Sequence, residues 1–221
     1  MILVMGVFSL EIKPIVDSML HLEAGELINR NYVRGTIGRN ELVATSGFIG
    51  KVETAIVTQK FIDAFSPDLA ILVSGAGGLV SEVKPGQLVI GSEFQEYDVN
   101  LPLRSGKVSI SSGESIAFSH FRNYIKETVT GKIISGDQIV ADRQKRDELH
   151  EHYHGLCLDM DSAAFAKTAL TSGVPFVVIK IVLDMCDENA EKDFNYNFEK
   201  FCKSGLPAHR VVEVMKSHII V

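Results

Sequence analysis

Acidic residues follow three apolar segments of the chain, at the point where each segment ends. Glu11 comes shortly after the first segment, Asp137 follows a short one, and Asp184 closes the run VPFVVIKIVLD. If these segments are strands of one sheet, the acids meet at its carboxyl edge, where open α/β folds bind ligands. Acids at strand ends are also common in turns, and Asp184 could instead cap one. We take the three acids as candidates for proton transfer, with Asp184 as the first of them.

Carboxyl groups that share a partly desolvated cleft acquire different pKa values. One of them can then donate a proton while another accepts one. This is the equipment for cleaving a glycosidic bond through an oxocarbenium-like transition state. The acids therefore predict a hydrolytic or group-transfer site for a sugar-linked substrate.

Two glycine-containing segments could bring the backbone close to a ligand. The residues SGAGG at 74–78 follow a buried apolar segment, and SGFIGK occupies positions 46–51. Neither has the spacing of a dinucleotide-binding fingerprint, and neither ends in the Gly-Lys-Ser/Thr of a phosphate-binding Walker loop. We predict a loop at residues 74–78 that lines the site, with a tight turn at the sheet edge as the alternative.

The segment Asp159-Met160-Asp161-Ser162 precedes the alanine-rich sequence AAFAKTAL. Asp161 or Ser162 could cap a helix there, with Met160 filling a gap in the core. In the functional alternative, Met160 lies along a flat ligand and an acid binds two vicinal hydroxyls. His150, His152 and His154 lie in a charged segment that is more typical of a solvated surface than of a metal site.

Composition limits the class of protein. The 221 residues are 46% hydrophobic and 23% charged, which suits one large α/β domain spanning residues 1–221. The net charge of −6 argues against nucleic acid or an anionic membrane as the main partner. Three widely spaced cysteines favour reduced thiols in the cytoplasm, and no segment is long enough for a transmembrane helix. We read the apolar N-terminus as a core strand and not as a signal peptide.

Strand-like and helix-like patterns alternate along the chain. We predict strands at residues 2–7, 27–37, 41–45, 69–73, 87–90, 132–134 and 174–183, and helices at 10–20, 50–65, 115–128, 162–170 and 198–218. Residues 93–113 are the least periodic, and we expect an irregular loop there.

In this order along the chain, the motifs resemble those of the nucleoside phosphorylase superfamily, specifically its 5′-methylthioadenosine/S-adenosylhomocysteine nucleosidases. The most specific pieces are AGGL followed by VKPGQLVIG, and DMDSAA followed by the strand that ends in Asp184. The resemblance covers most of the chain. It implies a three-layer αβα sandwich with a mixed, partly barrel-like sheet, a homodimer, and hydrolysis of an adenine nucleoside without metal or cofactor.

The resemblance also implies roles for residues. Asp184 would be the general acid that protonates the purine at N7, and Glu11 would orient and deprotonate the attacking water. Asp161 would bind the ribose 2′- and 3′-hydroxyls, with Met160 packed against the ribose. The remaining substrate-binding positions are Ala76 and Gly77 beside the ribose, Ile139 and Val140 beside the base, Asp159, and Phe198 (or Phe194) over the 5′ substituent.

Several residues depart from the family pattern. Asp161 stands where Glu is usual, which shortens its reach by about 1.5 Å, one single bond. Ile139 replaces a ring that stacks on the base, and Gly75 replaces a hydroxyl residue near the water. Leu183 stands where a small polar residue often supports the acid, and SGFIGK is one residue longer than SGIGK. Two alternatives therefore stay open: a phosphate-dependent phosphorylase, and a nucleoside-binding protein with weakened catalysis.

Overall fold

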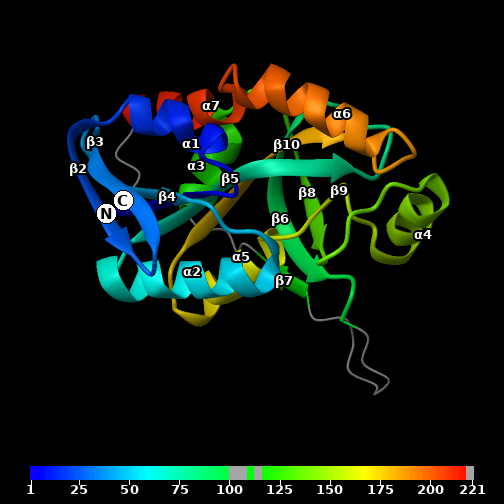
Figure 1. The fold of residues 1–221 in the computed structure, drawn as a ribbon, viewed down its shortest axis with the longest axis horizontal. Helices are drawn as coiled ribbons and strands as arrows, with labels where there is room; N and C mark the ends of the chain where they lie inside the picture. Colours follow the sequence, from blue (N-terminus) through cyan, green and yellow to red (C-terminus); the bar gives the residue numbers. More distant parts are fainter. Residues whose placement is uncertain (100–108, 112–115, 218–221) are drawn as a thin grey trace.

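A computed structural model describes residues 1–99, 109–111 and 116–217 (Figure 1). The strands are β1 (Ile2–Gly6), β2 (Leu20–Leu27), β3 (Arg30–Ile37), β4 (Asn40–Ser46), β5 (Leu69–Gly78), β6 (Leu88–Glu96), β7 (Ser109–Ser111), β8 (Thr128–Ser135), β9 (Cys157–Asp159) and β10 (Phe176–Asp184). The helices are α1 (Ser9–Asp17), α2 (Gly50–Phe65), α3 (Ile116–Tyr124), α4 (Arg143–Tyr153), α5 (Ser162–Thr171), α6 (Ala190–Asn197) and α7 (Leu206–Ser217), with a π-helical turn at Phe198–Cys202.

The strands form one mixed sheet that closes on itself at one end. Their order is β10-β6-β8-β9-β5-β1-β4-β3-β2, with β7 beside β6, and β10 also pairs with β5. The strands β10, β6, β8, β9 and β5 therefore make a closed ring, which confirms the predicted barrel-like character. Since β1 lies parallel to β4 and β5, and β5 parallel to β10, the carboxyl ends of these four strands share one edge.

Helices cover both faces of the sheet and confirm the predicted αβα sandwich. In Figure 1, α1, α6 and α7 lie above the sheet and α2 lies below it. Apolar residues of α1, α3 and α7 form one core with alternate residues of β1, β5 and β10. Residues of α2 and α5 form a second core with the other residues of the same strands, because successive strand side chains point to opposite faces.

The sequence does not predict β2, β9, α4 or α6, and α6 buries only Ala190 and Asn197. Strand β2 is largely exposed and α4 buries only Leu149, so neither carries the apolar periodicity of a core element. Strand β9 is three residues long. Within the described residues, no helix combines the length and the apolar character that a bilayer span requires.

The predicted loop at residues 74–78 is wrong. These residues continue β5 to Gly78, because β10 and β9 pair with them along the ring. Strand β6 likewise continues to Glu96 inside the stretch expected to be irregular, and β7 also belongs to that stretch. The rest of it lies largely outside the described residues. The predicted helix at 198–218 is divided into the π-helical turn and α7.

Candidate active site

An apolar cavity of about 600 Å³ lies at the shared carboxyl edge of β1, β5 and β10. Its walls come from the β1–α1 turn, the start of α2, β5, residues 138–141, residues 158–161, the end of β10 and α6. This volume is typical of a small-molecule site. Glu11 and Asp184, which are 173 positions apart in the sequence, both line the cavity.

Glu11 lies in the first turn of α1 and is 2% exposed. Its Oε2 accepts the N–H of Phe8 at 2.8 Å, and its Oε1 accepts the N–H of Gly75 at 2.8 Å. Burial raises the pKa of Glu11 to about 7, although both backbone N–H groups and the Lys180 charge act in the opposite direction. A carboxyl group with a pKa near neutrality can take a proton from water and release it again.

Asp184 ends β10 directly after a β-bulge. The pairing of β10 with β5 shifts between Val182 and Asp184, so Asp184 lies opposite Gly77. Bulges of this kind re-aim a side chain at a sheet edge. Oδ1 of Asp184 accepts the N–H of Cys186 at 2.8 Å. Burial raises the pKa of Asp184, which favours the protonated form that a general acid requires.

Both acids lie close to strand β5. A Cβ placed on Gly75 would lie 3.6 Å from Glu11 Oε1, and one placed on Gly77 would lie 2.9 Å from Asp184 Oδ1. These glycines are two residues apart on one face of the strand, a separation of roughly 7 Å. Glycosidases that invert configuration place their acid and base about 6.5–9.5 Å apart, which leaves room for water and a sugar carbon between them.

A buried ion cluster lies beneath the part of the cavity that residues 158–161 line. Lys180 Nζ lies 2.8 Å from Asp159 Oδ2 and 2.8 Å from Asp161 Oδ1, and Ser74 Oγ donates to Asp161 Oδ2 at 2.8 Å. Burial raises the pKa of Asp161, and the neighbouring Asp159 charge adds to this. Burial alone would also raise the pKa of Asp159, but Lys180 lowers it below its usual range. Asp161 therefore lines the cavity while Lys180 and Ser74 fix the position of its carboxylate.

Lys180 is a site residue that the sequence patterns did not single out. It lies in the middle of the apolar run of β10 and is fully buried. A lysine on a strand that is buried on both faces requires a buried carboxylate partner, and this rule links Lys180 to the acids at 159 and 161. Asp161 occupies the predicted N-cap position of α5, but its side chain makes no capping hydrogen bond. Asp159 instead accepts the N–H of Ser162 at 3.2 Å.

Most of the predicted substrate-binding residues line this cavity. They are Ala76, Gly77, Ile139, Val140, Asp159, Met160 and Asp161. Phe198 does not line it; its ring packs on Phe8 at 5.2 Å and on Phe194 at 5.7 Å between centroids. Phe8 and Phe194 are the rings of this cluster that face the cavity. The third candidate acid, Asp137, also lies outside the lining, although Gln138 beside it is included.

Two positions that depart from the family pattern lie against each other. A Cβ on Gly75 would lie 2.3 Å from Leu183 Cδ1. A side chain at position 75 would therefore require the Leu183 side chain to shift. Leu183 itself is fully buried in the core and does not line the cavity.

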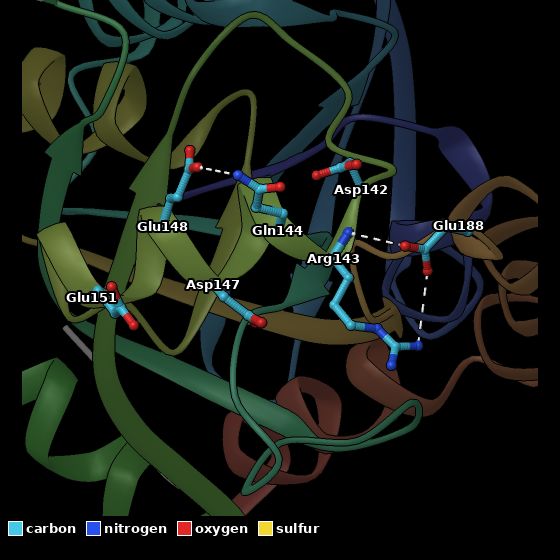
Figure 2. Close-up of a pocket in the computed structure, with 7 residues that line it drawn as sticks. All are labelled: Asp142, Arg143, Gln144, Asp147, Glu148, Glu151 and Glu188. Atoms are coloured by element: carbon cyan, nitrogen blue, oxygen red, sulfur yellow. Dashed lines mark hydrogen bonds and ion pairs between the residues drawn. The ribbon is translucent and has the colours of Figure 1, made fainter.

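A second hollow, of about 640 Å³, lies over α4 and is lined mainly by acids (Figure 2). Arg143 Nη2 lies 3.8 Å from Glu188 there, and Gln144 donates to Glu148 at 3.0 Å. His150 and His152 lie on the same helix. Within the described part of the chain, no three His, Cys, Asp or Glu residues form a group that could hold a metal ion. We interpret this hollow as a solvated charged surface, as the sequence indicates for the histidines.

The closed mixed sheet, its helical layers and an acid-lined cavity at the strand ends define an α/β protein with a small-molecule site. The family model described as "Phosphorylase superfamily" matches residues 1–208. The chain belongs to the phosphorylase superfamily.

One relative and two solved structures show which members of the superfamily this chain resembles. The chain is 41% identical over 201 residues to the 5′-methylthioadenosine/S-adenosylhomocysteine nucleosidase of Thermotoga maritima, covering 91% of this chain and 92% of the relative. Among solved structures, it resembles the nucleosidase of the same name from Neisseria meningitidis in complex with methylthio-immucillin-A, with a TM-score of 0.89, 28% identity and coverage of 98% and 99%. A futalosine hydrolase of Helicobacter pylori has the same fold, with a TM-score of 0.89, 23% identity and coverage of 98% and 97%.

Proposed function

We propose that this protein hydrolyses the N-glycosidic bond of adenine nucleosides of the 5′-methylthioadenosine and S-adenosylhomocysteine type. The observation that carries the proposal is the placement of Glu11 and Asp184 in one apolar cavity. The two glycines of β5 that they approach, Gly75 and Gly77, are roughly 7 Å apart along the strand. The 41% identity to a nucleosidase of this type supports the choice of substrate.

In the proposed reaction, the bond between C1′ of the ribose and N9 of adenine breaks, and its electron pair passes to the base. Asp184 gives its proton to N7, so the base leaves as neutral adenine. Oδ1 of Asp184 is held by the N–H of Cys186, which leaves Oδ2 to carry the proton toward the base. Water attacks C1′ from the other side, and Glu11 takes up its proton.

Asp161 and Met160 would hold the ribose during this step. Asp161 accepts hydrogen bonds from the two hydroxyls, and Lys180 and Ser74 hold its carboxylate in place. Asp159 would position Asp161 through the shared Lys180. The proposed chemistry uses side chains only and needs neither metal nor cofactor.

Phosphorolysis is the weaker alternative. A phosphate nucleophile requires cationic groups around a dianion. Among the described residues that line the cavity, none is Arg or Lys, whereas five are Asp or Glu. Arg34, on β3, lies outside the lining and over the ring of Phe65, at 5.9 Å from its centroid.

A substrate panel tests the proposal. Purified protein is incubated with methylthioadenosine, adenosylhomocysteine, adenosine and inosine, with and without phosphate, and the free base is measured. We expect adenine from the first two substrates at a rate independent of phosphate. Formation of a ribose 1-phosphate would establish phosphorolysis instead. Tight nucleoside binding without release of base would identify a binding protein with weakened catalysis.

Lengthening Asp161 tests its proposed contact with the ribose. The Asp161→Glu variant extends the carboxylate by about 1.5 Å toward the cavity. We expect a several-fold lower KM for methylthioadenosine and no change for its 2′,3′-dideoxy analogue, measured from the release of adenine. Equal KM values for the variant and the parent protein with methylthioadenosine would mean that Asp161 does not touch the hydroxyls.

We propose a homodimer that forms through the outer face of α2. Ile49, Val52 and Ile56 follow a helical spacing and are 54%, 69% and 52% exposed. Ile139, which is 84% exposed, is a further exposed apolar side chain, and it lines the cavity together with Ile49. A group of exposed apolar side chains on one helix face is typical of a protein interface. A second copy of the chain would cover it next to the site.

The Val52→Glu variant tests this surface. A buried charge without a partner should dissociate the dimer, so we expect the mass measured by light scattering to fall to that of one chain. Leu22→Glu places the same charge on an equally apolar, 56% exposed position of β2 and should leave the mass unchanged. A monomeric parent protein would contradict the proposed dimer.

A cytoplasmic location is also proposed. Cys157, Cys186 and Cys202 are buried and free of disulfides. This supports a reducing compartment.

A further inference from the structure

Three residues from three elements form a closed ring of interactions beside the cavity. The backbone N–H of Lys51, at the start of α2, donates to Asp137 Oδ1 at 2.8 Å. The N–H of Asp137, in the loop after β8, donates to Asp98 Oδ2 at 2.9 Å. Asp98, just beyond β6, accepts from Lys51 Nζ at 2.5 Å, which closes the ring.

The ring is partly shielded from water. The side chains of Lys51 and Asp98 are 14% and 19% exposed. Lys51 Nζ also lies 3.0 Å from Glu96, so one ammonium group serves two carboxylates. A Cβ on Gly50 would lie 3.1 Å from Asp137 Oδ1, so the start of α2 lies directly against this acid. The acid that the sequence offered for catalysis thus holds two segments together.

Both segments that the ring joins are walls of the cavity. Ile49 and Gly50 line it on the α2 side, and residues 138–141 line it on the other. Between the end of β8 and the start of α4, the described hydrogen bonds that hold the loop are few. Gly136 N–H donates to Asp159 O at 3.0 Å, and Tyr97 donates to Gln138 O at 3.3 Å. Val140 is 7% exposed and packs in an apolar cluster with Tyr97, whereas Ile139 is 84% exposed and its own packing does not fix it.

We propose that Lys51 is a positioning residue for this site: through Asp98 and Asp137 it fixes the loop around residues 137–139, and so places Ile139 against the substrate's base. The inference rests on the proposed function for the identity of the base. It assigns to Lys51 an effect on base binding without contact with the reacting atoms. Removal of the ammonium group leaves Asp98 and Glu96 without their shared cation, and their repulsion releases the loop.

The Lys51→Met variant removes the ammonium group and keeps the backbone N–H. We expect KM for methylthioadenosine and Ki for free adenine each to rise about tenfold, with kcat within threefold of the parent value. Lys51→Arg keeps the cation and should restore both constants. Lys167→Met is the matched control, because Lys167 reaches the same Glu96 at 3.7 Å but is 61% exposed and outside the ring.

A double-mutant cycle shows whether Lys51 and Asp98 act together, as the ring requires, or independently as two surface charges. Asp98→Asn alone should raise KM about as much as Lys51→Met, and the double variant should show no further loss. The proposal would be overturned if the increase in KM of the double variant equalled the product of the increases of the two single variants. It would also be overturned if Lys51→Met had the same KM and adenine Ki as Lys167→Met. If Lys51→Met does not fold, the Ki of adenine for the Asp98→Asn variant tests the proposal in the same way.

This experiment distinguishes the inference from the proposed function. If the parent protein binds adenine but releases none from nucleosides, the proposed hydrolysis fails while the adenine Kd still tests the ring. If hydrolysis proceeds normally and the constants of the Lys51 variants do not change, only the ring proposal fails.

Discussion

Replacement of Asp184 by Asn is expected to lower kcat for methylthioadenosine by about 10²–10⁴-fold, which is the usual contribution of a general acid. Asparagine keeps the oxygen that accepts the N–H of Cys186 at 2.8 Å, so the side chain should stay in place. It cannot deliver a proton to N7, so the base must leave as an anion. Release of adenine from enzyme saturated with substrate measures the effect.

Substrate binding and folding should survive this change. Burial disfavours the charged form of Asp184, so a neutral amide carries no penalty there. We expect Kd within a few-fold of the parent value and an unchanged melting temperature. Asp187→Asn is the matched control, because Asp187 lies in the same turn but outside the cavity lining. Near-parental turnover by the Asp184 variant would eliminate Asp184 as the acid.

Replacement of Glu11 by Gln is expected to have the second large effect, with opposite consequences for activity and stability. Glutamine cannot take a proton from water, so kcat should fall by about 10²–10⁴-fold. In the parent protein, kcat/KM should decline as the pH falls below about 7, because Glu11 then becomes protonated. The Glu11→Gln variant should lose this decline in kcat/KM at acidic pH.

The same carboxylate destabilises the fold above neutral pH. The pKa of Glu11 is 4.5 in its ordinary state and about 7 in the folded chain, so the folded state binds the proton more tightly. Stability therefore falls as the pH rises from about 4.5 through 7, by about 3 kcal/mol from this group. Glutamine removes this loss, but its NH2 group faces one of two backbone donors at a cost of about 1 kcal/mol.

Glu11→Gln should therefore raise the free energy of unfolding by about 2 kcal/mol at pH 8 and leave it nearly unchanged or lower at pH 4. For a chain of this size the gain at pH 8 corresponds to a melting temperature roughly 4–8 °C higher. Thermal unfolding of both proteins at the two pH values measures it. An equal difference in stability at both pH values would show that Glu11 is not held at a raised pKa.

Local patterns were sufficient for the elements that build the core. The predicted helix at residues 50–65 has the observed bounds of α2, and the run that ends in Asp184 is β10. These segments bury apolar side chains with a regular period, which is the property that sequence patterns report. The acids at 11 and 184 could be named for the same reason, since each follows such a segment.

Contacts between segments distant in the sequence determined the features that the sequence patterns did not predict. Residues 74–78 continue β5 because β9 and β10 hydrogen-bond to them, although five small residues in a row predict a loop. The charge of Lys180 is tolerated because Asp159 and Asp161 arrive from the β9–α5 turn. Asp137 follows a strand as Asp184 ends one, yet the backbone N–H of Lys51 at the start of α2 donates to it outside the cavity.

Local patterns alone predicted which side chains could move protons and which strands would carry them to one edge. Three-dimensional packing then selected which of those acids meet and which are held elsewhere. Burial, bulges and partners across the closed sheet set the direction of a carboxylate and its pKa. None of these is a property of the neighbouring residues in the chain.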